Sequence, residues 1–442
     1  MEQLNTINKA IGKYRWTICT LLFFATTINY LDRQVLSLLK DDLSLQFDWT
    51  EADYGRITGV FTFVYAISML FAGRLIDYLG TRRGYAWSII VWSVGAMVHA
   101  LSRGTAGFMV ARGVLGVGES GNFPAAIKAT AEWFPKKERA LATGIFNSGS
   151  NIGAILAPLT VPFIAAAWGW QMAFIIIGGI GFLWLVAWLL IYGSPLQKLQ
   201  KGQLSQGEYD YINADQTADQ AQADQDAKRM SWGKLLTFRQ TWAFVVGKFM
   251  TDGVWWFLLF WLPAFMSAQY GMSTTQIAIP LAVLYTMTCV GSIGGGWFPK
   301  VFINRGMEPY MARMRAMFII ALCPLFILSA QWLGGYNYWF AVIAIGIGAS
   351  AHQAWSANLF TTVSDMFPKK AVASVVGLGG MAGGLGGVLI NVGAGYIFDY
   401  WKAAGSLTTG YTIVFLICAL AYLIAWSAMK ILVPRFKEIK NV

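Results

Sequence analysis

The sequence is poor in charged residues and contains very little histidine and cysteine. Asp, Glu, Lys and Arg make up 12% of its 442 residues, about half of the roughly 25% that is usual in soluble domains. A water-soluble chain of this length needs a charged surface, so the composition excludes soluble globular and disordered proteins. Two His residues and four scattered Cys residues without a CxxC motif offer no pattern for a metal site or a disulfide framework.

Long runs of apolar residues dominate the sequence. Hydrophobic residues make up 56% of the chain, and the mean hydropathy is +0.52. A helix that crosses a bilayer needs about 20 predominantly apolar residues. The sequence therefore predicts an all-α membrane protein with twelve transmembrane helices. The predicted spans are 16–38, 53–76, 84–103, 106–130, 139–167, 170–193, 239–269, 275–303, 310–333, 337–365, 369–399 and 408–432.

A polar segment divides these spans into two sets of six. Residues 194–238 are rich in Gln, Asp, Ala and Lys, and we expect a solvated linker there, or a short surface helix. The sequence thus predicts an N-terminal six-helix bundle (1–193), a cytoplasmic linker (194–238) and a C-terminal six-helix bundle (239–442).

The distribution of positive charge predicts the orientation in the membrane. Of 33 Lys and Arg residues, 25 lie on the same side of the membrane as the N-terminus, and three, Lys40, Arg103 and Lys402, lie on the other. Loops rich in Lys and Arg remain in the cytoplasm. We therefore expect a multi-pass protein of the cell inner (plasma) membrane with both termini in the cytoplasm. This rule also explains the net charge of +11, so we expect no nucleic-acid partner.

An internal repeat relates the two halves. The segment Glu132-Trp-Phe-Pro-Lys-Lys137 follows the fourth span, and Asp365-Met-Phe-Pro-Lys-Lys370 follows the tenth, 233 residues later. Two pseudo-symmetric six-helix bundles with the substrate between them are a known transporter plan. The same offset pairs glycines that we expect to allow close helix packing. These pairs are Gly144 with Gly377 and Gly153 with Gly386.

The loop after the second span carries a transporter signature. It reads Gly73-Arg-Leu-Ile-Asp77-Tyr-Leu-Gly80-Thr-Arg82-Arg83. This segment resembles the pattern G-x-x-x-D-x-x-G-x-R-R of the major facilitator superfamily, with Tyr78 where a basic residue is usual. The resemblance implies that Asp77, Arg82 and Arg83 form a cytoplasmic gate between the bundles.

Four motifs inside the spans resemble a narrower group of that superfamily. Asn29-Tyr-Leu-Asp-Arg33 and Arg112-Gly-Val-Leu-Gly-Val-Gly-Glu119 are similar to motifs of the anion:cation symporter family. Its members carry organic anions together with protons or sodium ions. Ala351-His-Gln-Ala-Trp355 and Lys248-Phe-Met-Thr-Asp252 resemble the sugar-acid branch of the family, in particular the hexuronate transporters.

Charged residues within the spans are functional candidates, because each costs about 2.5–3.5 kcal/mol at mid-membrane. The resemblance implies that Asp32 and Glu119 couple transport to protons and that Arg33 binds the substrate carboxylate. A carboxyl group in a low-dielectric site favours its neutral form and can carry a proton, whereas a guanidinium stays charged and can hold a carboxylate through two hydrogen bonds. The alternative is a static ion-pair network between the first and fourth spans.

Further polar residues complete the predicted site. The repeat offset aligns Glu119 with His352, so His352 either faces the substrate or is a histidine packed between helices. Lys248 and Asp252 are four residues apart and either contact substrate or neutralise each other. Helix packing is the alternative for Tyr30, Tyr65 and Asn391 in particular. The predicted substrate-binding residues besides Arg33 are Arg112, Tyr30, Tyr65, His352, Gln353, Trp355, Asn358, Asn391 and Lys248.

These features predict a proton-coupled symporter that imports an organic anion by alternating access, with a hexuronate such as glucuronate or galacturonate as the favoured substrate. The alternatives are another sugar acid (galactonate or gluconate), a sodium-coupled carrier, an antiporter, or a non-transporting membrane receptor. No nucleophile–base or metal arrangement is present, so we do not expect an enzyme. We expect a monomer without a cofactor, whose partners are the small organic anion, the coupling protons and the lipid bilayer.

Overall fold

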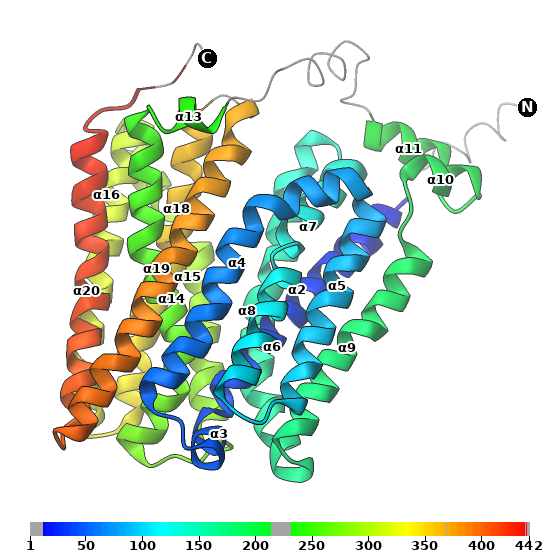
Figure 1. Ribbon diagram of the computed structural model, residues 1–442. Helices are drawn as coiled ribbons and strands as arrows, with labels where there is room; N and C mark the ends of the chain where they lie inside the picture. Colours follow the sequence, from blue (N-terminus) through cyan, green and yellow to red (C-terminus); the bar gives the residue numbers. More distant parts are fainter. Residues whose placement is uncertain (1–11, 214–230, 368, 438, 440–442) are drawn as a thin grey trace, which may run out of the picture.

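The structure is a bundle of long helices. The computed structural model describes residues 12–213, 231–367, 369–437 and 439. Within these residues the chain forms helices and no β-strand, and the long helices run side by side along a common direction (Figure 1). A helix pairs its backbone polar groups internally, as the hydrocarbon core of a bilayer requires. The predicted all-α fold class is confirmed.

The twelve predicted spans correspond to twelve helical units in the described part of the chain. Nine of them contain a segment that is long and apolar enough to cross a membrane. The units are α2 (Tyr14–Leu38), α4 (Glu51–Leu79), α5 (Thr81–Val98) with η1 (His99–Leu101), α6 (Thr105–Glu119) with α7 (Asn122–Trp133), α8 (Lys136–Trp168), α9 (Trp170–Ile191), α14 (Arg239–Tyr270), α15 (Ala278–Ile303), α16 (Pro309–Leu322) with η2 (Cys323–Ser329) and α17 (Ala330–Gly334), α18 (Tyr338–Met366), α19 (Lys369–Ala403) and α20 (Leu407–Leu432).

Two spans that the sequence predicts as continuous are interrupted. The span 106–130 is divided between α6 and α7 by a turn at Ser120 and Gly121, and the span 310–333 contains the 3-10 helix η2. Proline explains both breaks, because it lacks a backbone N–H and its ring clashes with the carbonyl four residues earlier. Pro124 follows the first break, and Pro324 lies at the start of η2.

Short helices add to the predicted elements. A helix outside the prediction, α3 (Lys40–Phe47), follows α2. The linker contains α10 (Pro195–Gln200), α11 (Gln206–Asn213) and α13 (Trp232–Leu235). Part of it is docked rather than solvated, because the buried Glu208 of α11 accepts hydrogen bonds from the backbone N–H groups of Tyr14 (3.2 Å) and Arg15 (3.1 Å) at the start of α2.

The repeat is visible in how the helices pack. A Cβ atom added to Gly153 of α8 would collide with the main-chain oxygen of Thr27 in α2. In the second half, a Cβ atom added to Gly386 of α19 would collide with the main-chain oxygen of Phe249 in α14. The matched glycines thus allow the fifth span of each half to approach the first, which confirms the expected close packing. The other matched pair, Gly144 and Gly377, has open space around both residues.

The two halves meet along α4 and α19. In Figure 1 the helices from α2 to α9 lie on one side and those from α14 to α20 on the other, with α4 beside α19. Glycines bring these two helices together, since a Cβ atom at Gly55 would lie 2.7 Å from the main-chain oxygen of Asn391 and one at Gly395 would lie 2.6 Å from that of Glu51.

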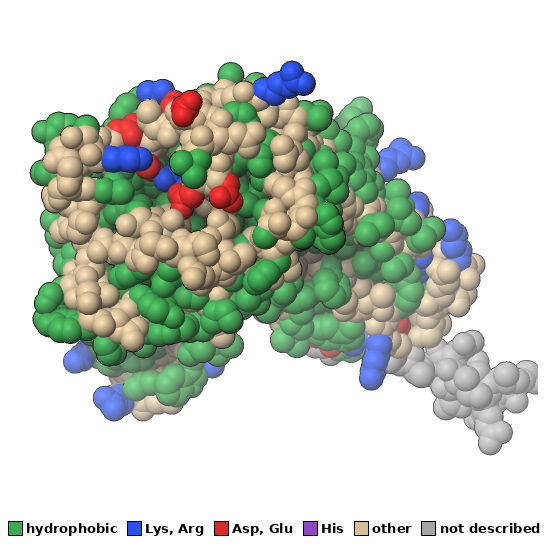
Figure 2. Space-filling model, turned by 90° about the horizontal axis from the view of Figure 1, so that it is seen from below, with side chains coloured by type: hydrophobic (Ala, Val, Ile, Leu, Met, Phe, Trp, Pro, Cys, Tyr) green, Lys and Arg blue, Asp and Glu red, His purple; other side chains and the backbone are tan. Residues whose placement is uncertain are grey.

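Charged residues fasten the two halves at the end of the molecule that carries α3. Asp399 of α19 accepts hydrogen bonds from the backbone N–H groups of Glu51 (2.7 Å) and Ala52 (2.9 Å) and so caps the first turn of α4. The buried Glu51 also pairs with Lys40 (2.6 Å) and with Lys402 (3.3 Å). We name Lys40, Glu51, Asp399 and Lys402 the end clasp. Acidic and basic side chains gather on this face in Figure 2.

We predict that Asp399→Ala opens this end of the molecule. Loss of a helix cap costs about 1 kcal/mol, which corresponds to roughly a fivefold shift in a conformational equilibrium. A cysteine placed at Ala52, in a protein whose four native cysteines are replaced, should then react roughly fivefold faster with a maleimide. Asp53→Ala is the control, because Asp53 caps the same helix through Thr50 from within α4. Equal acceleration by both variants would contradict the role of the clasp.

Candidate functional site

An ion pair between α2 and α6 forms the centre of the candidate site. The Nε and Nη2 groups of Arg33 both donate to Oε2 of Glu119, at 2.9 and 2.7 Å. Nη2 also donates to Oδ1 of Asn29, at 3.2 Å. The side chains of Arg33 and Glu119 are 3% and 0% exposed. Glu119 is the last residue of α6, and a helix C-terminus disfavours a negative charge, so Arg33 supplies the positive charge that this carboxylate needs.

Arg112 and Asp32 surround this pair. Both Nη groups of Arg112 donate to the main-chain oxygen of Arg33, each at 3.1 Å. Arg112 therefore holds the backbone of α2 at the residue that pairs with Glu119. Both carboxyl oxygens of Asp32 are buried and have no hydrogen-bond partner among the described residues, and the same holds for Oε1 of Glu119. Since buried polar groups are normally paired, these oxygens are available to a proton or a ligand.

Four aromatic rings enclose the guanidinium of Arg33. Its Cζ atom lies 4.6 Å from the ring centroid of Tyr30, 5.0 Å from Tyr65 and from Trp256, and 5.3 Å from Phe61. An arginine near a ring face is attracted to its π electrons. We name these four residues the aromatic cage of Arg33. The structure thus places Tyr30 and Tyr65, two predicted site residues, against a third.

A second cluster of predicted residues lies in the C-terminal half. Lys248 and Asp252 form an ion pair of 2.6 Å within α14. Nδ1 of the buried His352 lies 2.8 Å from the hydroxyl of Tyr422, and its ring stacks on Trp255 at 5.1 Å. Trp255 precedes Trp256 of the aromatic cage in the chain, so α14 contributes to both clusters.

The remaining polar candidates take part in helix packing. Asn358 donates to the main-chain oxygens of Gly295 (2.7 Å) and Ala354 (2.9 Å). Asn391 donates to the main-chain oxygen of Gly387 and accepts from Nε1 of Trp261, at 2.8 and 3.0 Å. These bonds tie α18 to α15 and α19 to α14. Two other candidates also lie on α18. Trp355 is fully buried, whereas Gln353 is half-buried.

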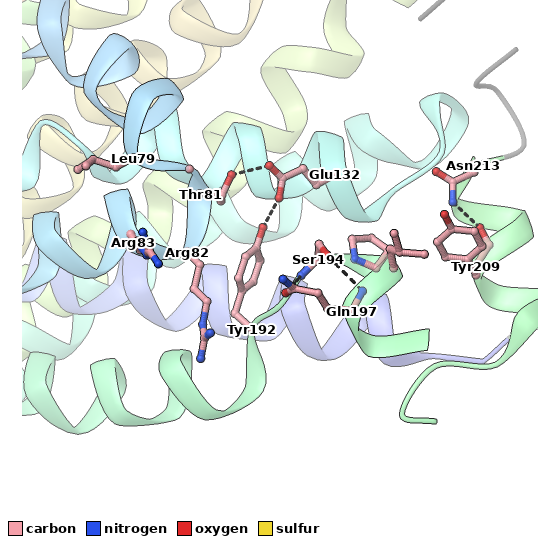
Figure 3. Close-up of a pocket in the computed structure, with 13 residues that line it drawn as sticks. Leu79, Thr81, Arg82, Arg83, Glu132, Tyr192, Ser194, Gln197, Tyr209 and Asn213 are labelled. Atoms are coloured by element: carbon pink, nitrogen blue, oxygen red, sulfur yellow. Dashed lines mark hydrogen bonds between the residues drawn. The ribbon is translucent and has the colours of Figure 1, made fainter. Parts of the chain in front are cut away.

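The predicted gate residues lie beside a pocket in the N-terminal half, at the end of the molecule that carries the linker helices. Arg82 and Arg83 are exposed on the first turn of α5 and line a pocket of about 580 Å³ (Figure 3). Arg82 donates to the main-chain oxygen of Leu189 in α9, at 2.5 Å. Asp77 belongs to α4, and its side chain lies outside the description. The gate function of these three residues stays a prediction.

A half-buried acid, Glu132, organises the wall of this pocket. Glu132 accepts hydrogen bonds from the hydroxyls of Thr81 (2.6 Å) and Tyr192 (2.5 Å), as Figure 3 shows. Burial and the neighbouring Glu132 carboxylate raise the pKa of Tyr192 well above its ordinary value. The phenol therefore keeps its proton and remains a donor. Glu132 of the repeated Glu132–Lys137 segment thus connects Thr81 at the start of α5 with Tyr192 directly after α9.

The sequence analysis missed Trp256 and Phe61 of the aromatic cage. A signal for both was present in the spacing of the chain. Trp256 follows Asp252 by four residues, and Phe61 precedes Tyr65 by four, so each shares a helix face with a residue that the prediction considered. Spacing of this kind shows which residues share a face, but not which helix lies opposite.

The comparisons with known proteins agree with this architecture. The chain matches the model of the Major Facilitator Superfamily over residues 22–391, and it belongs to this family. It is therefore a multi-pass membrane transporter and not an enzyme. This outcome confirms the family that the loop signature after the second span indicated.

Individual relatives are similar over most of the chain. The hexuronate transporter of Escherichia coli (strain K12) is 32% identical over 427 residues, which cover 96% of this chain and 95% of that protein. The galacturonate transporter of Dickeya chrysanthemi is 37% identical over 288 residues, which cover 65% and 82% of the two chains. In fold, the chain is similar to a bacterial homologue of the human lysosomal transporter Spinster in an inward-facing, occupied conformation, with a TM-score of 0.73, 18% identity, and 96% and 97% of the chains covered.

We predict that Glu119→Ala is strongly destabilising. Removal of one partner from a buried ion pair leaves an uncompensated charge and costs about 3–5 kcal/mol. The free energy of unfolding in mixed detergent micelles measures this loss. The control is Arg56→Ala, which removes the exposed pair of Arg56 with Asp53 (3.2 Å) and its exposed hydrogen bonds to the hydroxyl of Tyr396, because an exposed ion pair contributes only about 0–1 kcal/mol. Equal losses in the two variants would show that the Arg33–Glu119 pair has no special energetic weight.

Proposed function

We propose that the protein is a proton-coupled symporter that imports a sugar acid, with a hexuronate as the substrate. The buried Arg33–Glu119 pair carries this proposal, because it offers a cation that can bind a carboxylate and an acid that can take up a proton. The relatives named hexuronate and galacturonate transporters support the substrate class. The proton is the coupling ion, and the carrier works as a monomer without a further cofactor.

The substrate carboxylate and Glu119 compete for Arg33, and this competition couples substrate binding to proton binding. A substrate carboxylate offers the same acceptor oxygens as Glu119, so it replaces Glu119 at the Nε and Nη2 groups of Arg33. A buried carboxylate that loses its cation is costly, and Glu119 therefore takes up a proton when substrate arrives. The incoming proton matches the charge of the substrate carboxylate, and both ligands leave together on the cytoplasmic side.

Asp32 and Arg112 support this exchange. Asp32 is the second proton-binding group, because its carboxyl oxygens are buried without a hydrogen-bond partner among the described residues. Arg112 acts as a positioning residue through its two bonds to the main-chain oxygen of Arg33. In the C-terminal half, Lys248, His352, Gln353 and Trp355 contact the hydroxyl groups of the sugar acid.

Alternating access follows from movement of the two halves. We assign residues 1–193 and 239–442 to bundles that rock about the substrate, joined by the linker 194–238. The end clasp closes the pathway on the periplasmic side, and Asp77, Arg82 and Arg83 form the gate on the cytoplasmic side. Both termini then face the cytoplasm, as the distribution of Lys and Arg requires in the inner membrane.

We predict uptake of a hexuronate into proteoliposomes against its gradient when an inward proton gradient is imposed. Labelled glucuronate, galacturonate, galactonate and gluconate are compared, each with a proton gradient, a sodium gradient or neither. Accumulation of a hexuronate with protons alone is the expected result. Accumulation of an aldonate (galactonate or gluconate) would show that the substrate is an aldonate instead of a hexuronate. Accumulation driven by the sodium gradient would show that sodium is the coupling ion instead of the proton. Uptake only against a preloaded counter-substrate would indicate an antiporter, and binding without flux would indicate a receptor.

We predict that Glu119→Gln and Asp32→Asn uncouple transport from protons. An amide keeps the size of the carboxyl group but cannot release a proton, so both variants should exchange internal for external substrate while accumulation falls to the equilibrium ratio. Asp53→Asn is the control and should leave accumulation intact, because Asp53 is half-buried and pairs with the exposed Arg56 in the first two turns of α4. Full accumulation by Glu119→Gln would contradict the coupling role of Glu119.

A further inference from the structure

We infer that Trp256 is a positioning residue that completes the anion site of Arg33 from the opposite half of the molecule. The inference rests on the proposed function and extends it to a residue that the charged motifs do not include. Tyr30 lies on α2, and Phe61 and Tyr65 lie on α4, so these three rings belong to the same half as Arg33. Trp256 lies on α14 and brings the C-terminal half into contact with the guanidinium, at 5.0 Å.

The position of Trp256 is fixed by its surroundings. The indole is 6% exposed. Its ring stands edge-on to Phe61 and to Tyr65, with centroid distances of 5.9 Å in both cases, and stacks on Phe260 at 5.6 Å. Gly387 of α19 provides the room, because a Cβ atom added there would lie 2.5 Å from Cδ1 and 2.8 Å from Cγ of Trp256. A glycine of the Gly-rich eleventh span thus seats this ring.

The face of an aromatic ring is a suitable contact for a cation that exchanges one bound carboxylate for another. The N–H groups of a guanidinium lie in its plane and bind carboxylates there, whereas an aromatic ring attracts the charge through its π face. Arg33 can therefore exchange Glu119 for a substrate carboxylate while its contact with Trp256 persists. Indole is the strongest of the natural aromatic rings in this interaction.

The consequence for transport is a link between substrate binding and the arrangement of the halves. The site that holds the carboxylate is complete only when α14 lies close enough for Trp256 to reach Arg33. Substrate bound at Arg33 therefore favours conformations in which the two halves are closed around it. Simple packing of Trp256 is the competing explanation, and it depends on the shape of the ring rather than on its π electrons.

Fluorination of the indole separates these explanations, because each fluorine weakens the negative ring face with little change in shape. We expect the KM for hexuronate exchange to rise stepwise from tryptophan to tetrafluorotryptophan at position 256, by about tenfold in total. The matched control is Trp184, which is equally buried, at 6% exposed, and lies in α9. A flat series at position 256, or equal effects at both positions, would overturn the inference.

A second pair of variants tests the seat of the ring. Gly387→Ala should displace Trp256 and raise the KM for exchange, and the fluorination series in that background should become flat. Gly393→Ala is the matched control on the same helix, because a Cβ atom there meets open space. An unchanged KM in Gly387→Ala would contradict the inference.

Exchange is measured without a proton gradient, so the KM does not depend on proton-driven accumulation. Failure of the native protein to bind or exchange any hexuronate would refute the proposed function itself. Normal exchange by the native protein together with a flat fluorination series would refute only the role of Trp256.

Discussion

A buried guanidinium is the constraint on which the rest of this structure depends. Arg33 remains charged in any protein environment, and a charge in the middle of a bilayer is costly. The chain meets this cost with one carboxylate from α6 and with aromatic rings from α2, α4 and α14. Four helices must therefore be placed correctly around a single side chain, and an error in any of them leaves the charge exposed to an apolar environment.

The contacts of Arg33 leave part of the Glu119 carboxylate without a hydrogen bond in the described part of the chain. Glu119 lies at the C-terminal end of α6, where a negative charge is disfavoured, and it uses one carboxyl oxygen for both bonds to Arg33. Its other oxygen has no hydrogen-bond partner among the described residues. By contrast, Lys248 and Asp252 form an ion pair within one helix, and Nζ of Lys248 lies 4.7 Å from the ring centroid of Phe360 in α18.

Much of the fold follows from the sequence, because the length of an apolar run and the cost of buried charge are local properties. The helix positions and the Lys248–Asp252 pair could be predicted from such local properties. The breaks near Pro124 and Pro324 were missed because a proline inside an apolar run does not reduce its hydropathy enough to end it. Contacts between helices were out of reach for another reason. Spacing along one helix does not reveal that Arg112 binds a main-chain oxygen, or that Asn391 is engaged with Trp261.

Two helices of the end clasp, α4 and α19, also carry residues that surround the Arg33 site. The clasp and the site are therefore mechanically connected. On α4, Glu51 of the clasp lies ten residues before Phe61 of the aromatic cage, which is about 15 Å along a helix. On α19, Asp399 of the clasp lies twelve residues after Gly387, the seat of Trp256, or about 18 Å. A helix transmits displacement over such distances with little bending. Separation of α4 from α19 at the clasp would therefore move Phe61 and Tyr65 relative to Gly387, the glycine against which Trp256 packs.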